Sequence, residues 1–498
     1  MDDHQESVSK IIDRVRDFSQ RNAPFRIYHG STSTTRRTKL SRENVVDTSG
    51  LDKVLAVDKE RRVAVVEPNV SMAKLVDATL IHGMLPKVVM ELPAITVGGG
   101  FAGTSGESSS FKWGYFEKTV SRIEIVLADG ELVEASREVR PDLLHGAGGS
   151  FGTLGVITLL DVDLIPALPF VELRYRQTTD AADAVSITER TALDPKTDYL
   201  EGIMLSLNRG VVISGRLTDG QDSKLPVMRF SRAGDPWFYL HVEDVLRGEV
   251  DIDNYRELVP LVDYLFRYDR GAFWGGKYSF QYFYMPFNAI TRWALDSLLR
   301  TKVMYHALHK SHLADEYVVQ DIGFPYATLP RFVEWLDERL GFYPLWLCPL
   351  KIDEDFALHP RRLAAFEPDA QSPGMMMNVG IWGPGPRQYG PFVEVNRAIE
   401  TKTKELGGLK CFYAQAFYSK AEFWSIYDKS WYDELRSLYK ASGLPSVQQK
   451  VNVDLSKWTP THELPWRPWL YERFKEQWPV KGLYGALQAL LGSEYLLG

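Results

Sequence analysis

The sequence predicts an α+β fold built from two domains and a C-terminal tail. The chain has 498 residues, more than one hydrophobic core usually serves. Over residues 1–165, short strand-like runs and helical patterns are mixed without the regular strand–helix repeat of a parallel sheet. After Pro166 the pattern changes, and residues 230–350 are rich in Trp, Tyr and Phe. We therefore expect one domain over 1–165, a second over 166–445, and a tail over 446–498.

The first domain is expected to begin with an amphipathic helix, because apolar residues recur at helical spacing from Val8 to Phe18. Ser71 can cap a second helix, which Gly83 ends. Asp129-Gly130 is a strong signal for a two-residue hairpin turn. Short strands are expected at Phe25–Tyr28, Val54–Val57, Arg62–Val66, Ile123–Leu127, Leu132–Ala135 and Gly155–Ile165.

The second domain also mixes strands and helices. A helix is expected over Thr328–Gly341, which carries proline in its first turn and a terminal glycine. Residues 353–374 are expected to be a loop insertion, and Met375–Trp382 a strand. The capping-box pattern of residues 419–422 predicts a helix start, and the apolar residues from Phe423 to Leu438 are expected on one face of that helix.

The composition is that of an ordinary globular protein and excludes several classes of function. A net charge of -7 without a Lys/Arg-rich block argues against nucleic acid as a partner. The two cysteines, Cys348 and Cys411, exclude a disulfide scaffold, and the ten histidines show no metal-ligand spacing, so we expect no metal. The charged N-terminus does not have the pattern of a secretory signal, and we expect a reducing, cytoplasmic location.

The C-terminal tail leaves two alternatives open. Residues Val480–Leu497 are apolar and follow a segment with Trp458, Trp466, Trp469 and Trp478. One alternative is that this segment packs onto the body of the protein. The other is a peripheral contact with an intracellular membrane, because Trp and apolar residues suit the lipid headgroup boundary. No run of roughly 18 uncharged apolar residues is present, so no membrane span is expected.

The stretch Gly98–Gly103 satisfies the G-x-G-x-x-G pattern of dinucleotide-binding folds. Such a fingerprint should lead directly into a helix whose N-terminus holds the diphosphate. Here the chain continues with Thr-Ser-Gly-Glu-Ser-Ser-Ser, which is polar and has no helical periodicity. We therefore expect a loop rather than a Rossmann fold in this part of the chain.

Three stretches of small residues, His29–Arg36, Thr96–Trp113 and His145–Gly155, suggest another kind of phosphate site. Glycine lets backbone N–H groups approach a phosphate closely, and the hydroxyl groups of Ser and Thr add donors without bulk. Each stretch alone is also compatible with a tight turn. Three of them in the first domain favour a site that grips one diphosphate.

Two motifs add a family resemblance. Pro93–Gly99 reads P-A-I-T-V-G-G, and Gly152–Thr158 reads G-T-L-G-V-I-T. In this order and together with the first loop, they resemble the FAD-binding domain of the vanillyl-alcohol oxidase/p-cresol methylhydroxylase (PCMH) family. The resemblance implies a PCMH-type FAD-binding domain followed by an α+β substrate domain, which we call the cap.

One branch of that family resembles the chain more closely. Residues 106–133 are similar to the E-S-S-S-x-K-x-G…V-L-A-D-G signature of the delta(24)-sterol reductases, the Diminuto-like branch. Coverage extends from about residue 25 to 445, and further similar segments are Val318–Asp321, Tyr343–Pro349, Tyr413-Ala414 and Glu422–Trp424.

Three departures from the branch leave the substrate open. Phe111 stands where the branch usually has His. Animal and plant members carry an N-terminal membrane anchor, whereas this sequence starts with what we expect to be its soluble part. The tail after about residue 450 has no counterpart that we can place, so a diverged member could act on another lipid-like alkene.

The resemblance implies FAD as the cofactor. We expect it to be held non-covalently, because His29 precedes the loop glycine instead of lying inside the loop. The residues expected to bind FAD are His29, Gly30, Ser31, Thr32, Ser33, Thr34, Thr96, Val97, Gly98, Gly99, Gly100, Gly103, Thr104, Ser105, Ser108, Ser109, Lys112, Gly155, Val156 and Ile157.

By the same resemblance, the reaction is the reduction of a carbon–carbon double bond in a sterol or related lipid-like substrate, with NADPH as transient hydride donor. An isolated alkene has no carbonyl to accept charge, so protonation to a tertiary cation before hydride transfer is the easier route. This route needs a general acid and aromatic walls around the cation. The candidates for the acid are Tyr413, Tyr418 and Asp321, which lie on or beside segments similar to the branch.

Two other functions stay open at this point. One is an FAD-dependent alcohol oxidase or dehydrogenase of the same fold. The other is a flavin-retaining lipid-binding protein without turnover. Mixing the protein with NADPH without oxygen separates them, because only a reductase would bleach its flavin rapidly.

Overall fold

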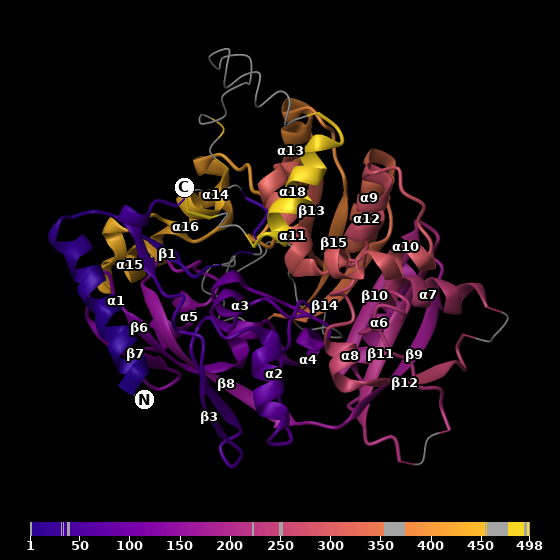
Figure 1. Cartoon of the computed structure of the whole chain (residues 1–498), viewed down its shortest axis with the longest axis horizontal. Helices are drawn as coiled ribbons and strands as arrows, with labels where there is room; N and C mark the ends of the chain where they lie inside the picture. Colours follow the sequence, from indigo (N-terminus) through magenta and orange to yellow (C-terminus); the bar gives the residue numbers. More distant parts are fainter. Residues whose placement is uncertain are drawn as a thin grey trace.

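The computed structural model describes residues 2–30, 32, 34–36, 40–221, 224–248, 252–352, 374–453, 455, 477–492 and 496–497. Within these residues, two large antiparallel sheets lie side by side, each covered by helices (Figure 1). The chain passes from the first sheet to the second between Pro166 and Phe170. The arrangement is the α+β fold that the sequence predicts.

The first half of the molecule contains the strands β1 (Arg26–Tyr28), β2 (Val45–Asp47), β3 (Val54–Asp58), β4 (Val63–Val66), β5 (Met84–Pro86), β6 (Val120–Val126), β7 (Leu132–Ser136) and β8 (Val156–Pro166). The sheet has the order β3-β4-β8-β6-β7, with β5 beside β8, while β1 and β2 form a separate parallel pair. Val126 pairs with Leu132 across the predicted hairpin turn, where Gly130 has a φ of +83°. All six strands predicted in this half are confirmed.

The helices of this half are α1 (Asp2–Gln20), α2 (Met72–Leu80), α3 (Val97–Gly103), α4 (Ser110–Trp113) and α5 (Pro141–Ala147). The amphipathic helix α1 buries Val8, Ile11, Val15 and Phe18, as its spacing predicts. Ser71 caps α2 by accepting a hydrogen bond from the Lys74 N–H at 3.3 Å. Both predicted helices are therefore confirmed.

The glycine-rich stretch differs from the prediction, because it forms the helix α3 instead of a loop. Thr96 caps it by accepting from the Gly99 N–H at 3.1 Å, and Thr104 ends it with a φ of 53°. A Cβ atom added at Gly98 would lie 2.7 Å from the Cβ of Pro68. Close packing of α3 on the preceding segment thus requires glycine, and this outweighs the low helix propensity of that residue.

The second half contains β9 (Phe170–Thr178), β10 (Tyr199–Ser206), β11 (Arg209–Thr218), β12 (Arg256–Pro260), β13 (Tyr317–Pro325), β14 (Leu345–Lys351), β15 (Met375–Pro384) and β16 (Leu409–Lys410). They form a sheet in the order β12-β9-β11-β10-β14-β15-β13-β16. The strand predicted at Met375–Trp382 is β15, which is confirmed. The loop insertion predicted over 353–374 lies outside the described residues except for Gly374.

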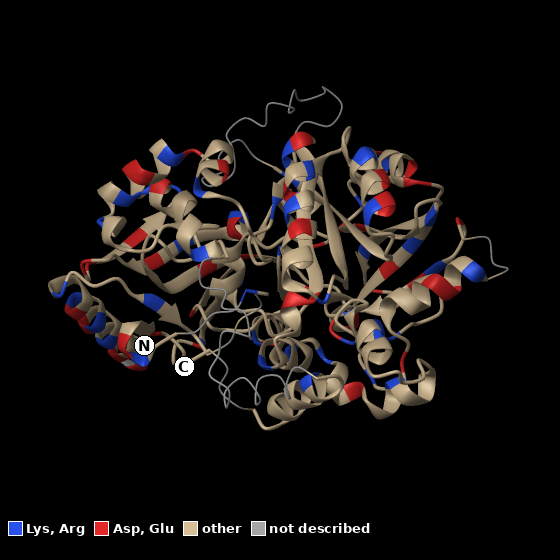
Figure 2. Ribbon diagram, turned by 90° about the horizontal axis from the view of Figure 1, so that it is seen from above, with Lys and Arg blue, Asp and Glu red and all other residues tan. Residues whose placement is uncertain are grey.

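The helices of this half are α6 (Ala181–Ala192), α7 (Phe238–Arg247), α8 (Leu261–Leu265), α9 (Gly275–Tyr282), α10 (Ala289–Ala294), α11 (Thr301–Ser311), α12 (Leu329–Arg339) and α13 (Tyr389–Glu405). The helix predicted from Thr328 is α12, and Gly341 follows it with a φ of +61°. Acidic and basic residues are mixed along both halves of the molecule (Figure 2).

The C-terminal helices are α14 (Lys420–Ile426), α15 (Lys429–Leu438), α16 (Val447–Val451) and α18 (Val480–Leu490). Ser419 and Glu422 form the predicted capping box of α14. The single helix expected from Phe423 to Leu438 is wrong, because Asp428 caps a new helix by accepting from the Trp431 N–H at 3.0 Å. Leu438 is exposed instead of sharing the apolar face.

The end of the chain returns to the first half before it reaches α18 (Figure 1). Tyr439, after α15, donates to Asp142 of α5 at 2.8 Å, and Lys440 pairs with Asp129 at 2.6 Å. Residues just after α15, which the sequence assigns to the second domain, therefore contact the first half. Further on, α18 packs against α11, where a Cβ added at Gly485 would lie 2.5 Å from the carbonyl oxygen of Ala307. Trp458, Trp466 and Trp469 lie outside the described residues.

Candidate active site

A cavity of about 700 Å³ is lined by residues of both halves of the molecule. The first half contributes β1, the segment after it, and α3. The second half contributes α9, α11 and the strands β13 to β15. Leu483 and Ala486 of α18 also line it. A cavity of this size between two halves is a common location for a cofactor and its substrate.

The cavity brings together many of the residues that the sequence predicts to bind FAD. They are His29, Thr32, Thr34, Thr96, Gly98, Gly99, Gly103, Thr104, Ser105, Gly155 and Ile157. Ser31 and Ser33 lie outside the described residues. Gly30, with a φ of +82°, Val97, Gly100 and Val156 are neighbours of this set and do not line the cavity themselves. A Cβ added at Gly103 would meet no atom within 4 Å, so this glycine leaves open space in the cavity wall.

The first amides of α3 are not available to a phosphate, contrary to what the glycines suggest. The N–H groups of Val97 and Gly98 donate to the carbonyls of Val70 and Pro68 at 2.8 and 2.7 Å. The Gly99 N–H donates to the Thr96 side chain. The glycines of α3 therefore bring the backbone close to its neighbours, and hydroxyl-bearing residues such as Thr32, Thr34 and Ser105 line the cavity.

Ser108, Ser109 and Lys112 are also predicted to bind FAD, and the structure places them elsewhere. Ser108 and Ser109 are fully buried and donate their hydroxyl groups to Glu107. Lys112 pairs with Asp198 at 3.0 Å. None of the three lines the cavity. Lys112 and Ser108 connect the first half to the second, since Asp198 precedes β10 and Ser108 lies 3.1 Å from the Tyr264 hydroxyl.

A buried ion pair continues this network into the second half. Glu201 accepts from Arg267 at 2.8 Å, and its other oxygen accepts from Tyr268 and from the Trp346 indole, both at 2.8 Å. Arg267 also donates to Ser108 at 3.3 Å. The E-S-S-S sequence thus contributes to the contact between the two halves. The residue types of the motif alone do not distinguish this role from ligand binding.

Three basic residues on the cavity wall were not predicted, and we call them the cationic cluster: Arg26, Arg36 and Lys450. Burial, and then the nearby guanidinium groups of Arg26 and Arg36, lower the pKa of Lys450 to about 7. Burial and Arg26 likewise lower the pKa of Arg36 to about 9. Of the three, only Arg36 lies in a stretch that the sequence links to phosphate binding. Lys450 comes from a segment more than 400 positions further along the chain, so the sequence does not indicate that the two meet.

His29 lies on the same wall. Its Nδ1 atom is buried and has no hydrogen-bond partner among the described residues. Burial and the nearby Lys450 lower the pKa of His29 to about 4, so the imidazole is neutral at pH 7.

The second polar group on the wall is centred on Asp321, as two of the predicted acid candidates meet there. The Tyr413 hydroxyl donates to Oδ2 of Asp321, and the Asn378 amide donates to Oδ1 at 2.6 Å. The Trp382 indole donates to the Tyr413 oxygen at 3.2 Å. Burial raises the pKa of Asp321 to about 7, although the bonds from Tyr413 and Asn378 oppose the rise. Asp321 can therefore hold or release a proton near neutral pH.

The first predicted loop positions this group. The Thr35 N–H donates to the Tyr413 carbonyl at 3.1 Å, and Arg36 donates to the carbonyls on either side, those of Phe412 and Ala414. His309 of α11 contacts the Thr34 carbonyl at 2.7 Å. The loop expected to bind FAD and the tyrosine expected to act as acid are thus adjacent.

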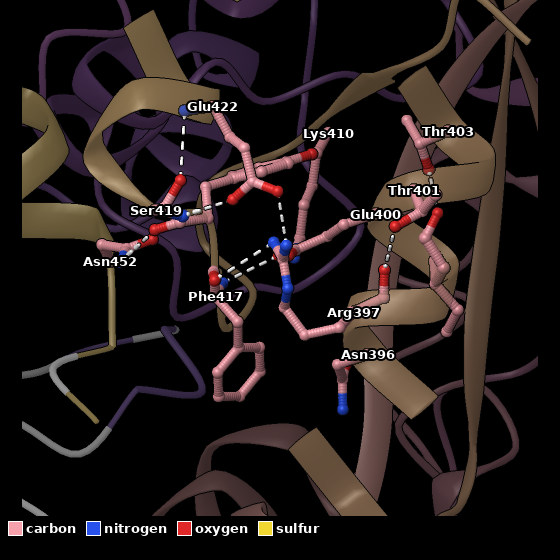
Figure 3. A network of polar contacts seen from close by, with 12 residues as sticks. Asn396, Arg397, Glu400, Thr401, Thr403, Lys410, Phe417, Ser419, Glu422 and Asn452 are labelled. Atoms are coloured by element: carbon pink, nitrogen blue, oxygen red, sulfur yellow. Dashed lines mark hydrogen bonds and ion pairs between the residues drawn. The ribbon is translucent and has the colours of Figure 1, made fainter. Parts of the chain in front are cut away.

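Tyr418, the third acid candidate, is not among the residues that line the cavity. It is buried in an aromatic cluster with Phe412, Phe423 and Tyr427. Beside it, Lys410 and Arg397 pair with Glu400 at 2.7 and 3.1 Å in a buried polar network (Figure 3). Its surroundings are those of a structural tyrosine, because its ring packs among these rings and lies 5.7 Å from the Lys410 ammonium group.

Aromatic side chains form the wall around Asp321. Phe273 and Trp382 lie with ring centroids 4.2 Å apart, and Trp346 is 6.1 Å from Trp382. Tyr278 of α9 lines the same space. Such a wall suits an apolar substrate and can stabilise a developing positive charge.

Glu91 is a further cavity residue that the sequence did not single out. Its Oε1 atom is buried without a partner among the described residues. Burial, and then the neighbouring Glu107, raise the pKa of Glu91 well above its usual range. Burial thus favours the protonated form of the Glu91 carboxyl group on the cavity wall.

Comparisons with known proteins agree with this site. Residues 4–136 match the family described as FAD binding domain. The chain is 28% identical to a delta(24)-sterol reductase of Pisum sativum over 89% of the chain and 82% of the relative. It is 26% identical to that of Homo sapiens over 90% and 86%. The chain is thus similar to the delta(24)-sterol reductases along about nine tenths of its length. A third relative, from Arabidopsis thaliana, is 28% identical over 89% of the chain.

The main departure from this branch does not reach the cavity. Phe111, where the branch usually has His, is buried in the apolar core of the second sheet and is not among the lining residues.

In the described part of the chain, no helix is long and apolar enough to cross a membrane. Nor do His, Cys, Asp and Glu gather there in any group of three that could hold a metal ion.

Proposed function

We propose that this protein is an FAD-dependent oxidoreductase that reduces a carbon–carbon double bond of a sterol or related lipid-like substrate, with NADPH as the hydride donor. Similarity to the delta(24)-sterol reductases along about nine tenths of the chain supports the reaction class. The observation that carries the proposal is the hydrogen-bonded pair of Asp321 and Tyr413 on the aromatic wall of the cavity.

The residues of the first half fit FAD. Open space at Gly103, hydroxyl groups of Thr32, Thr34 and Ser105, and the unpartnered Nδ1 of His29 all face one cavity. A bound FAD would supply a hydride acceptor for NADPH and a hydride donor for the substrate. We propose non-covalent binding, and acid precipitation that leaves the yellow colour in the pellet would contradict it.

The proton would come from the Asp321–Tyr413 pair. With Asp321 protonated, its carboxyl group donates to the Tyr413 oxygen, and the tyrosine O–H is free to point into the cavity. Tyr413 then gives its proton to one alkene carbon and takes the proton of Asp321 in the same step. Trp382 holds the tyrosine oxygen in place throughout.

The other alkene carbon becomes a tertiary cation, which hydride then neutralises. The faces of Phe273, Trp346 and Trp382 can stabilise this charge, because aromatic rings are negative on their faces. The aromatic wall also excludes water, which would otherwise trap the cation.

The test separates the two half-reactions. The holoenzyme is mixed anaerobically with NADPH, and the flavin absorbance is followed. Desmosterol, a sterol with a side-chain alkene, is then added to the reduced enzyme. We expect bleaching by NADPH and recovery of the colour with formation of the saturated sterol. Failure to bleach, together with reduction of the flavin by an alcohol, would replace the proposal by an alcohol oxidase or dehydrogenase.

We also propose a peripheral contact with an intracellular membrane through α18. Four leucines of this segment, Leu483, Leu487, Leu490 and Leu491, are more than half exposed and recur at helical spacing. Leu483 also lines the cavity, so the exposed apolar face adjoins the space where a lipid-like substrate would bind. An apolar helix face of this kind suits the headgroup boundary.

Flotation with phosphatidylcholine vesicles tests the contact. The wild-type chain is expected to float with the vesicles, and Leu487→Glu is expected to stay in solution. Leu438→Glu is the matched control, because Leu438 is equally exposed on α15. Equal flotation of the three proteins would remove the proposal without affecting the reaction.

A further inference from the structure

The cationic cluster is an uncompensated set of positive charges inside the protein. Arg26, Arg36 and Lys450 all line the cavity, and Arg36 is only 7% exposed. Across the described residues, no carboxylate lies within ion-pair distance of any of the three. Within the described part of the chain, the partners of Arg36 and Lys450 are backbone carbonyls, those of Phe412, Ala414 and Phe151.

Such a cluster opposes folding unless an anion joins it. Moving a cation away from water is unfavourable, and the repulsion between like charges adds to that cost. Burial, and then repulsion from Arg26 and Arg36, lower the pKa of Lys450. Proteins retain buried charges of this kind where a ligand neutralises them.

We propose that Arg26, Arg36 and Lys450 bind the diphosphate of FAD. A diphosphate carries negative charge and many acceptor oxygens, which suit two guanidinium groups and one ammonium group. Arg26 and Arg36 lie within residues 4–136, the part that matches an FAD binding domain. The first amides of α3 are occupied by Val70, Pro68 and Thr96, so these amides do not meet the charge of a diphosphate.

The inference rests on FAD as the cofactor and does not depend on the substrate. The phosphate groups of NADPH have the same chemistry as those of FAD. The test therefore has to distinguish binding of FAD from binding of NADPH. FAD and riboflavin are titrated in parallel into full-length apoprotein, and the quenching of flavin fluorescence gives each Kd. Riboflavin carries the same ring without any phosphate.

Lys450→Met keeps the length of the side chain and removes its charge. We expect the Kd for FAD to rise about 10- to 100-fold, the range of a lost charge-assisted hydrogen bond, with little change for riboflavin. Arg26→Gln, which alters a β1 residue outside the Lys450 segment, is expected to act in the same direction. Lys440→Met is the control, because Lys440 is half exposed and pairs with Asp129 outside the cavity.

Four outcomes decide the question, after circular dichroism shows that each variant is folded. A selective loss of FAD affinity supports the proposal. An equal loss for FAD and riboflavin would assign the cluster to the ring, and unchanged affinities would remove it from cofactor binding. If only the KM for NADPH in the holoenzyme rises, the cluster serves the hydride donor and the proposal is overturned. If the protein binds FAD but does not reduce a sterol, all four results can still be interpreted.

Discussion

The hydroxyl group of Tyr413 and the carboxyl group of Asp321 share a hydrogen bond on the wall of the cavity, and the Trp382 indole donates to the same tyrosine oxygen. Tyr413 follows β16, and Asp321 lies on β13, the neighbouring strand of the second sheet. The sheet therefore positions Asp321, while Thr35 and Arg36 hold the turn that carries Tyr413 through its backbone carbonyls. A rigid pair of this kind can deliver a proton to one place in the cavity.

Tyr413→Phe should remove the proton donor and leave the cavity shape unchanged. In the anaerobic reoxidation of the reduced enzyme by the sterol, we expect the rate to fall about 10²- to 10⁴-fold, as for the loss of a general acid. Reduction of the flavin by NADPH should stay near the wild-type rate. Tyr418→Phe is the matched control, because this tyrosine lies in the aromatic cluster outside the cavity. Equal rates for Tyr413→Phe and the wild type would exclude Tyr413 as the donor.

The pH dependence of the same step should report Asp321. Burial raises the pKa of this carboxyl to about 7, so the group is protonated below that pH and ionised above it. Since the protonated form feeds Tyr413, the rate of sterol-dependent reoxidation should be level at low pH and fall as pH rises through about 7. Stopped-flow measurements from pH 5.5 to 9, a range set by the approximate pKa, would show it.

Asp321→Asn is the companion variant for that profile. It cannot supply a proton, so reoxidation should be slow at every pH and lose the break near 7. Asp77→Asn, on the exposed side of α2, should keep the wild-type profile. A break near pH 7 that persists in Asp321→Asn would assign the titration to another group.

The ion pair of Glu201 and Arg267 gives a prediction about stability. Both side chains are fully buried, and Glu201 also accepts from Tyr268 and Trp346. Glu201→Gln leaves Arg267 without its closest negative charge, so we expect a loss of about 3–5 kcal/mol in the free energy of unfolding. Urea denaturation of the holoenzyme measures it. Asp433→Asn breaks an exposed pair with Lys429 and should change stability by less than about 1 kcal/mol.

Local patterns in the sequence predict much of the fold because each depends on neighbouring residues. The spacing from Val8 to Phe18, the Asp129-Gly130 turn and the Ser419 capping box all describe contacts within one or two turns of chain. The E-S-S-S sequence shows the limit. Its residue types suit phosphate binding, but Ser108 bonds to Glu107, Tyr264 and Arg267, and the latter two come from the other half of the molecule.

Site residues on segments similar to the family could be predicted from the sequence. Site residues that only the folded chain brings together could not. Asp321 and Tyr413 lie on or beside segments similar to the branch, so both could be proposed from the sequence. Arg26 and Lys450 lie far apart in the chain and in no motif, and only the packing of α16 against the first half brings them to one wall. A single basic residue on a strand or a short helix does not indicate which distant residue will lie beside it in the folded protein.

Gly103 offers a test of the cavity that does not depend on charge. A Cβ there meets no atom within 4 Å, and the residue lines the cavity at the end of α3. Gly103→Leu should therefore fold normally and fill space that FAD needs, so that the purified protein carries little flavin and binds added FAD at least about tenfold more weakly. The absorbance of the purified protein and fluorescence titration measure both. Gly50→Leu is the matched control, because a Cβ at Gly50 is equally unhindered and lies outside this cavity. If Gly103→Leu retains full FAD while its apoprotein melts at the wild-type temperature, FAD does not occupy the space beside α3.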